Sequence, residues 1–291
     1  MIFCDLCNSN RFKKTNYYVG KQNLIRCKKC GFIRLNYFKK EYDKDLYQYY
    51  NNYSKSVKPK EWKERAKLNL ENLIKSLNKF SEKYQKRQKD LSLLDFGCGL
   101  GLTLEAANKI GWNAFGIEMN DFCLKFCRER NQNVFSDLTK INENTKFDII
   151  TLFDVIEHVP NPTDLLRNLK TKLKDNGFLI ITTPNWNSLE RILFQNDWKA
   201  IDPQHYHYFT KKTFINSLNK SKLVLVELKT RNFNPFQKKA KSNNKILKDQ
   251  KFTATKLRSI SSKGMGFILK KILNLILNTF SLGSTLEIIC K

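Results

Sequence analysis

Short apolar runs with β-strand character recur through the middle of the chain at helix-sized intervals, and this alternation constrains the fold more than any other feature. The runs are SLLDF (92–96), NAFGI (113–117), FDIITLF (147–153) and GFLIITT (177–183). The stretches between them have helical patterning, at 102–110, 120–130 and 162–174. Strands that alternate with helices favour a parallel sheet covered on both faces. The pattern therefore predicts an α/β fold.

The flanks of this core are expected to carry further elements. A long helix rich in Glu and Lys is expected at 60–88, leading into the core. An aromatic-rich loop follows residue 183, and after it the patterning predicts helices near 211–220 and 264–280 and strands at 223–229 and 285–290.

The charge of the chain is large and unevenly distributed. The formal net charge is +26, and it is concentrated in residues 1–90 and 231–291, whereas 91–230 is nearly neutral. Such a balance invites a nucleic-acid or anionic-membrane partner. With 42 Lys but only 11 Arg, the compositional bias of an A/T-rich genome is an equal alternative. No apolar run of about 20 residues is present, and no secretory signal is recognised, so we expect a cytoplasmic protein.

Eight cysteines are present, and four of them form the pattern C-x2-C-x19-C-x2-C. Two such pairs can place four thiolates around one Zn²⁺, which accepts a tetrahedral sulfur shell. We therefore expect a structural zinc ribbon over residues 1–40, with a disulfide pair or redox dithiols as the alternative. Its metal ligands would be Cys4, Cys7, Cys27 and Cys30. The other four cysteines are expected to be small buried residues.

A glycine-rich turn follows the first apolar run of the core. In LLDFGCGLG (93–101) the strand passes into Asp95, and Gly97, Gly99 and Gly101 follow. Glycines let the backbone turn sharply and let a ligand approach closely. The second strand ends at Glu118, and an acidic residue there can accept both ribose hydroxyls of a nucleoside. A carboxylate at position 95 would repel pyrophosphate but suits a cofactor that carries an ammonium group.

Several segments together resemble class I S-adenosylmethionine-dependent methyltransferases, over roughly 90–230 and 285–290. The matching segments, in chain order, are LLDFGCGLG, GIEMN (116–120), FSDL (135–138), FDIITLFDVIEHVPNP (147–162) and LKDNGFLIITTPN (173–185). The resemblance implies a Rossmann-like seven-stranded sheet of order 3-2-1-4-5-7-6 with strand 7 antiparallel. TLEIIC (285–290) fits strand 7.

The resemblance also implies cofactor-binding residues. Gly97 and Gly99 should line the methionine portion of S-adenosylmethionine, with Asp95 near its amino group, and Glu118 should take the ribose hydroxyls. The alternative is that these glycines only shape a turn.

Two further acidic residues are implied less directly. Asp137 should lie beside the adenine, and Asp154, after the fourth strand, should border the pocket of the transferable methyl group. Either acid could instead cap a helix.

The flanking segments resemble a bacterial subgroup that has an N-terminal zinc ribbon, a tyrosine-rich stretch and a connecting helix before the methyltransferase domain. In this chain those parts correspond to 1–40, 41–90 and 91–291, with a basic insertion at about 231–263. Members of the subgroup often accompany surface-polysaccharide pathways. The resemblance therefore implies methylation of a small-molecule or saccharide acceptor, and we expect the methylated atom to be oxygen.

The loop at 187–210 resembles the segment W…P-x-H…YF that covers the transferable methyl in this subgroup, here Trp198, Pro203, His205 and Tyr208. A histidine with a near-neutral pKa could take the proton from an acceptor hydroxyl. The catalytic candidates are His205, His207 and His158. The alternative is that these side chains only pack the loop.

Two other functions stay open at this point: methylation of ribosomal RNA, for which a zinc ribbon and basic surface would also serve, and a non-catalytic binding module of a polysaccharide assembly complex. The basic segment 238–263 and the apolar helix expected at 264–280 also suggest a peripheral contact with the inner face of an anionic membrane. The alternative for that helix is packing on the sheet before strand 7.

Overall fold

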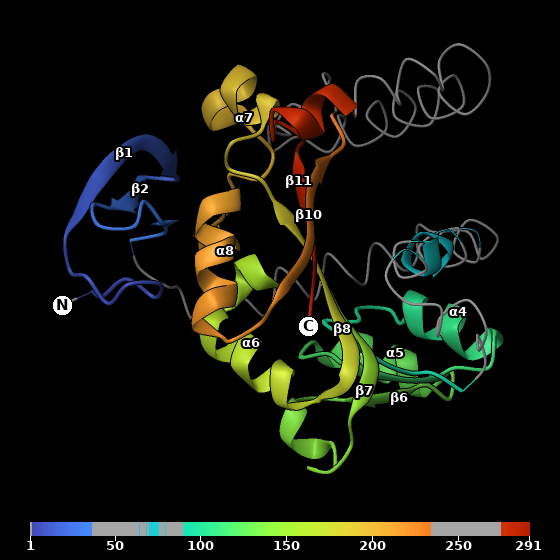
Figure 1. Cartoon of the computed structure of the whole chain (residues 1–291). Coiled ribbons are helices and arrows are strands. Elements are labelled where there is room, and N and C mark those ends of the chain that lie inside the picture. The colour runs from blue at the N-terminus through green and yellow to red at the C-terminus, as the bar shows by residue number, and fades with distance from the viewer. Residues whose placement is uncertain are drawn as a thin grey trace.

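The chain forms two sheets in the computed structural model (Figure 1). The structure describes residues 2–36, 90–233 and 275–291, a helical piece at 70–75 and the single positions 64, 68 and 79. The expected helix at 60–88, the tyrosine-rich stretch and the basic segment 238–263 therefore lie largely or wholly outside the described residues, as does the first part of the helix expected at 264–280. None of the described helices is long and apolar enough to cross a membrane.

The larger sheet has seven strands in the order β10-β11-β8-β7-β4-β5-β6. They are β4 (Ser92–Phe96), β5 (Asn113–Ile117), β6 (Asn133–Phe135), β7 (Phe147–Phe153), β8 (Leu173–Pro184), β10 (Leu225–Arg231) and β11 (Thr285–Cys290). Numbered along the core as strands 1 to 7, this is the order 3-2-1-4-5-7-6. Strand β11 pairs antiparallel with both β10 and β8, whereas the other pairs are parallel. The expected fold class is confirmed.

The helices that accompany the sheet bury its two faces. The α-helices are α4 (Leu102–Lys109), α5 (Asp121–Arg128), α6 (Pro162–Thr171), α7 (Leu189–Phe194) and α8 (Lys211–Lys220). Consecutive strand residues point to opposite faces. Thus Leu93 and Ile149 pack in one buried cluster with α4 and α5, while their neighbours Leu94 and Ile150 pack in another with α6 and α8.

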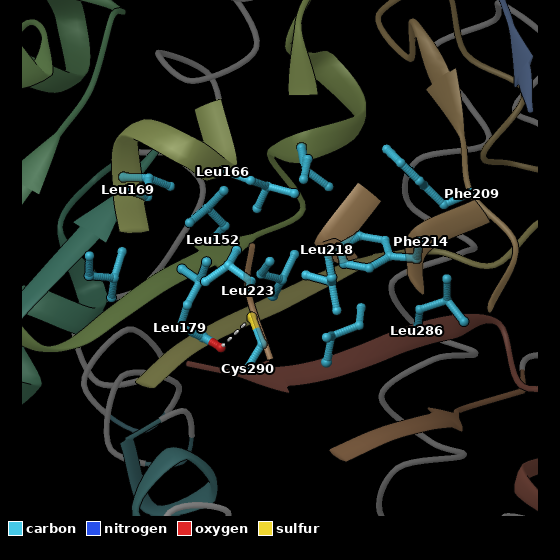
Figure 2. Packing of buried hydrophobic residues seen from close by; sticks show 14 of the residues in the cluster. Leu152, Leu166, Leu169, Leu179, Phe209, Phe214, Leu218, Leu223, Leu286 and Cys290 are labelled. Atoms are coloured by element: carbon cyan, nitrogen blue, oxygen red, sulfur yellow. Dashed lines mark hydrogen bonds between the residues drawn. The ribbon is translucent and has the colours of Figure 1, made fainter. Parts of the chain in front are cut away.

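Figure 2 shows the second of these clusters. Side chains of α6 and α8 meet those of β7, β8 and β11, and the thiol of Cys290 donates to the carbonyl oxygen of Leu179 at 3.6 Å. The labelled residues are Leu152, Leu166, Leu169, Leu179, Phe209, Phe214, Leu218, Leu223, Leu286 and Cys290. This packing fixes the strand ends from which the loops of the site emerge.

The smaller sheet has the order β1-β2-β3-β9. Three strands come from the N-terminal segment, β1 (Phe12–Val19), β2 (Gln22–Cys27) and β3 (Ile33–Arg34). The fourth, β9 (His207–Tyr208), comes from the aromatic-rich loop after β8. The N-terminal segment, blue in Figure 1, therefore shares a sheet with a loop of the core.

A candidate methyl-transfer site and a cysteine cluster

The glycine-rich turn lies between β4 and α4, against the loop that follows β7. The amides of Gly97 and Cys98 both donate to the carbonyl oxygen of Ile117, at 2.7 and 3.0 Å, which ties the turn to the end of β5. Gly97 has a φ of 78°, and a Cβ at this position would lie 2.4 Å from Cγ2 of Val155. Only glycine fits there, because the conformation is left-handed and the neighbouring loop is in contact.

Glu118 closes the same turn from β5. Its Oε2 accepts from the Gly99 amide at 2.8 Å, and its Oε1 accepts from the Asn120 amide at 2.8 Å. Glu118 is buried, with 8% of its surface exposed. Each carboxylate oxygen has a second lone pair, so both can accept a further hydrogen bond, such as one from a ribose hydroxyl. The residues expected to bind the methionine and ribose portions therefore lie together.

Asp95 lies beneath the turn and is also buried. Its Oδ1 accepts from the Thr151 hydroxyl at 2.6 Å. Burial raises the pKa of Asp95 to about 6, although hydrogen bonds from Thr151 and Thr103 oppose the rise and Glu118 adds to it. A carboxylate that is poorly solvated favours a cation beside it, which fits the expected proximity of a cofactor ammonium group.

Asp137 and Asp154 occupy different surroundings. Asp137 caps the short helix η1 (Leu138–Lys140), where it accepts from the Thr139 amide at 2.9 Å. Bonds from the Thr139 hydroxyl and amide lower the pKa of Asp137. This is the capping arrangement that the sequence left open, and it does not prevent contact with an adenine.

Asp154 directly follows β7 in a left-handed conformation, with φ of 56°. Its Oδ1 accepts from the Thr182 hydroxyl at 3.1 Å. It lines a cavity of about 220 Å³ together with Leu73, Phe153 and Arg231. A carboxylate in a positive-φ turn at the end of a central strand is suited to border a bound ligand.

His158 and His205 face each other where the loop after β7 meets the aromatic-rich loop. Their ring centroids are 4.7 Å apart at an interplanar angle of 74°. Nδ1 of His158 lies 2.8 Å from the Gln204 carbonyl oxygen, and Nδ1 of His205 lies 2.9 Å from the Ala200 carbonyl oxygen. A carbonyl oxygen only accepts, so both Nδ1 atoms carry the proton and each Nε2 keeps a lone pair.

The basicity of His205 differs from the sequence expectation. Burial, assisted by the neighbouring His158, lowers the pKa of His205 to about 4. Burial also lowers the pKa of His158. Both imidazoles are therefore neutral at pH 7, but His205 is a weaker base than the near-neutral group that the sequence suggested.

Glu157 is a buried acid beside this pair, and the sequence reasoning missed it. Its Oε2 accepts from the Thr183 hydroxyl at 3.0 Å, and its Oε1 has no partner among the described residues. Burial and the nearby Asp154 raise the pKa of Glu157 well above its usual range. Ligand atoms of Glu157, His158 and His205 all lie within 4.8 Å of one another, so the cluster could hold a proton or a cation. The only indication of this acid in the sequence was that Glu157 directly precedes His158 in the segment EHVP.

His207 lies apart from that cluster and faces the N-terminal segment. It is buried, and its Nε2 lies 3.1 Å from the Pro160 carbonyl oxygen. Its ring stacks on Phe32, with centroids 5.2 Å apart. Burial, with Arg34 nearby, lowers the pKa of His207 to about 3. The other aromatic residues of the loop are packed similarly: Trp198 and Tyr208 are buried, and both rings contact Trp186.

The four N-terminal cysteines form one cluster. Their sulfur atoms all lie within 4.8 Å of one another, with Cys4 3.5 Å from Cys30 and Cys7 3.4 Å from Cys27. A Zn–S bond of 2.3 Å in a tetrahedron implies sulfur separations of roughly 3.8 Å. The cluster is thus close to a metal-bound shell and well beyond disulfide length, and all eight cysteines are free.

The backbone of the cluster has matching turns at both cysteine pairs. The Asn8 amide donates to the Cys4 carbonyl oxygen at 2.8 Å, and the Gly31 amide donates to that of Cys27 at 3.0 Å. Asn8 and Gly31 both adopt positive φ, 54° and 79°. Each pair therefore lies in a tight knuckle, and the donor set fits Zn²⁺.

Comparison with known proteins places the core in a family. Residues 62–228, more than half of the chain, match the family model described as "Methyltransferase domain". A curated "Ubiquinone biosynthesis O-methyltransferase" of Actinobacillus pleuropneumoniae is 30% identical over 53% of this chain and 74% of its own length. Another of that name from Glaesserella parasuis is 36% identical over 32% of this chain, and the match spans 45% of the relative's length.

A solved structure supports the fold assignment. The plantazolicin methyltransferase in complex with a triazolic desmethylPZN analog and SAH aligns with a TM-score of 0.52 at 16% identity, over 86% of this chain and 91% of that chain. An identity this low shows the fold alone. Together with the sheet order and the family match, it leads to one conclusion: the chain belongs to the methyltransferase domain family and has the class I fold of S-adenosylmethionine-dependent methyltransferases.

Proposed function

We propose that the protein transfers a methyl group from S-adenosylmethionine to a hydroxyl oxygen of a small-molecule or saccharide acceptor. The observation that carries the proposal is the meeting of two loops: the glycine turn closed by Glu118 contacts Val155, and His158 and Glu157 follow Val155 in the same loop. The cofactor residues and the histidine pair therefore belong to neighbouring strand ends. The relatives named as O-methyltransferases support oxygen as the atom methylated.

In this proposal each of the cofactor-binding residues contacts a particular part of S-adenosylmethionine. Glu118 accepts the ribose hydroxyls, Asp95 favours the ammonium group, and Gly97 and Gly99 leave room for the methionine portion. Asp137 is proposed beside the adenine, and Asp154 beside the transferable methyl. When bound, S-adenosylmethionine supplies an electrophilic methyl group on its sulfonium.

The histidine pair is proposed to manage the acceptor proton. The acceptor oxygen would bond to the methyl carbon as the methyl–sulfur bond breaks, which would leave the neutral thioether of the cofactor, and the oxygen would lose its proton to Nε2 of His205. The ring of His158 packs against that of His205 and holds it in place. The Ala200 carbonyl keeps Nδ1 of His205 protonated, so that Nε2 is the free base. Trp198 and Tyr208 pack the loop and exclude water, which supports a positioned transfer. His207 faces the N-terminal segment, and its proposed share in turnover is indirect.

A structural Zn²⁺ is the second part of the proposal. Cys4, Cys7, Cys27 and Cys30 would hold it in a closed four-sulfur shell, which leaves no position for a substrate. The fit of the sulfur separations and of the two knuckles supports this assignment.

A peripheral contact with anionic membrane is a third and separate part. The support is the exposure of Leu275, Ile276 and Phe280 at the described end of the expected apolar helix, while Leu277 is buried against the core. The nine basic residues at 238–263 precede this helix in the sequence. The acceptor would then be lipid-linked.

One experiment decides the acceptor class. The purified protein is incubated with methyl-labelled S-adenosylmethionine and a fractionated cell extract, and the label is followed into soluble, lipid and RNA fractions. Label in a soluble or lipid-linked hydroxylated compound supports the proposal. Label in ribosomal RNA would replace it by the RNA alternative. Cofactor binding without labelling of any fraction would favour a binding module.

A further inference from the structure

We propose that the N-terminal ribbon, residues 2–36, is a positioning element of the site, and that Phe32 is its principal positioning residue. In this view the ribbon holds the segment that carries His205 without touching the acceptor. The inference rests on the proposed function only in assigning His205 to the acceptor. The contacts that carry it are independent of any substrate.

The backbone beside His205 is held from two sides. The Tyr206 amide donates to the Glu157 carbonyl oxygen at 2.8 Å, and the Tyr206 carbonyl oxygen accepts from the Leu35 amide at 2.9 Å. The first bond joins the loop to the core, and the second joins it to the ribbon. His205 directly precedes Tyr206, so its backbone orientation depends on both attachments.

Strand β9 continues this attachment beyond Tyr206. Tyr208 and His207 pair antiparallel with Ile33 and Arg34 of β3. A two-residue strand has too few hydrogen bonds to persist alone, so its place depends on its sheet partner. Among the described residues its strand partner is β3 of the ribbon, while the next residue, Phe209, forms a bridge with Asn185 of the core.

Phe32 connects the cysteine cluster to β9 through its side chain. It is fully buried, and its ring centroid lies 5.2 Å from both His207 and Phe209. Its carbonyl oxygen accepts from the Cys27 amide at 2.8 Å, and it lies two residues after Cys30. Phe32 therefore provides a direct side-chain link between the second cysteine knuckle and the loop.

Polar contacts reinforce the same junction. The buried Arg34 donates to Oδ2 of Asp5 at 2.8 Å and to the Phe3 carbonyl oxygen at 3.1 Å. That same Asp5 oxygen lies 3.8 Å from Nδ1 of His207. Asp5 stands between Cys4 and Cys7 in the sequence, so the first knuckle also contacts β9.

Strand β1 holds the earlier part of the same loop. The Arg191 guanidinium lies 5.1 Å from the ring centroid of Tyr17 and 4.7 Å from that of Trp186. The Tyr18 amide donates to Oδ1 of Asn196 at 2.9 Å. The ribbon thus contacts the loop both before and after His205. A displacement of about 1 Å at a reacting group can lower a rate on the order of a hundredfold.

The test compares Phe32→Ala with Tyr18→Ala, which removes an exposed aromatic side chain from the same ribbon and keeps the backbone amide that donates to Asn196. For Phe32→Ala we expect faster hydrogen exchange in peptides covering 205–209, unchanged cofactor affinity by calorimetry, and a fall in kcat of about tenfold or more. Tyr18→Ala should match the wild type in all three. Phe32→Leu, which keeps an apolar side chain but loses the ring contacts with His207 and Phe209, should give exchange rates and a kcat between those of Phe32→Ala and the wild type.

Several outcomes would overturn the inference. Unchanged exchange at 205–209 in Phe32→Ala, or equal effects from Tyr18→Ala, would remove the positioning role. If Phe32→Ala loses metal and unfolds the ribbon, the milder Phe32→Leu decides: slower turnover with metal retained supports positioning, and wild-type exchange and turnover contradict it. Because exchange and calorimetry need no acceptor, a protein with no methyl transfer would refute the proposed function while the exchange result still tests the contact.

Discussion

Glu118 closes the glycine turn with both carboxylate oxygens, and we propose that it also accepts the ribose hydroxyls of the cofactor. We expect Glu118→Ala to weaken cofactor binding about 10- to 100-fold, because a hydrogen bond to a charged group contributes roughly 1.5–3 kcal/mol. Calorimetric titration with S-adenosylhomocysteine measures the effect. Glu105→Ala is the control, because it removes a half-buried acid of α4 that pairs with Lys109 and not with the turn, and it should bind normally. Unchanged affinity in Glu118→Ala would place the ribose elsewhere.

The lowered pKa of His205 makes a prediction about pH. A base must be deprotonated to act, so kcat/KM should rise as the pH increases through about 4 and stay level above it, rather than rising near 6.5.

His205→Ala should lower kcat about 100- to 10,000-fold with cofactor affinity nearly unchanged, because only proton transfer is removed. A rate profile and single-turnover assays check both. A fully active His205→Ala variant would leave the residue with a packing role only.

Single residues also show which features of the site could be predicted from the sequence and which could not. The positions of Asp95, Gly97, Gly99 and Glu118 at one turn followed from their places at the ends of two neighbouring strands. The exposure of a histidine does not follow from its neighbours in the sequence. His205 and His207 lie on either side of Tyr206, and only the pairing of β9 with β3 decides which of them faces the ribbon and which faces His158.

At the scale of elements, the junction of the β4–α4 turn with the loop after β7 is tight. Gly97→Ala should reduce the free energy of unfolding by about 2–4 kcal/mol, since a left-handed non-glycine residue costs roughly 1–2 kcal/mol and the overlap with Val155 adds to this. Gly20→Ala is a matched control, because Gly20 has a φ of 59° but a Cβ added there would meet no atom within 4 Å. It should lose only the conformational part. Equal losses in denaturant unfolding would contradict the contact.

The order of the elements in the larger sheet was predictable, whereas the pairing of the N-terminal strands with the loop after β8 was not. The alternating runs predicted a covered parallel sheet, and the resemblance implied seven strands, their order and the antiparallel last strand, all of which the structure confirms. Strand β9 escaped prediction because two residues leave no periodic pattern and their partner, β3, lies far away in the sequence. The strand expected at 223–229 begins at Leu225 and extends to Arg231, where it pairs with Thr285 of β11.

For the whole molecule, the zinc proposal predicts one Zn²⁺ per purified chain. Cys27→Ser should lose the metal and lower Tm, because the free energy of metal binding stabilises the folded ribbon. Cys123→Ala, which removes a buried core cysteine, should keep the metal. Elemental analysis and thermal unfolding under reducing conditions provide the measurements. A metal-free chain with the same Tm would argue against the site.

The proposed membrane association also concerns the whole molecule. Flotation with anionic vesicles should decrease with added salt and with deletion of 238–263, since each Lys near such a surface contributes about 1 kcal/mol. Neutral vesicles are the control. Equal flotation with both kinds of vesicle, or no flotation at low salt, would leave the exposed Leu275, Ile276 and Phe280 without a lipid partner.

The pairing of β3 with β9 also has a consequence for biosynthesis. All four cysteines of the ribbon leave the ribosome early, but Tyr208, the partner of Ile33, is added about 175 residues later, which at usual elongation rates takes roughly 9 to 35 seconds. During that interval the nascent ribbon has an open sheet edge, a surface that invites pairing with another chain. Assembly of the four-cysteine cluster and completion of the sheet are therefore separate events in time, and the methyltransferase core completes the domain that was translated before it.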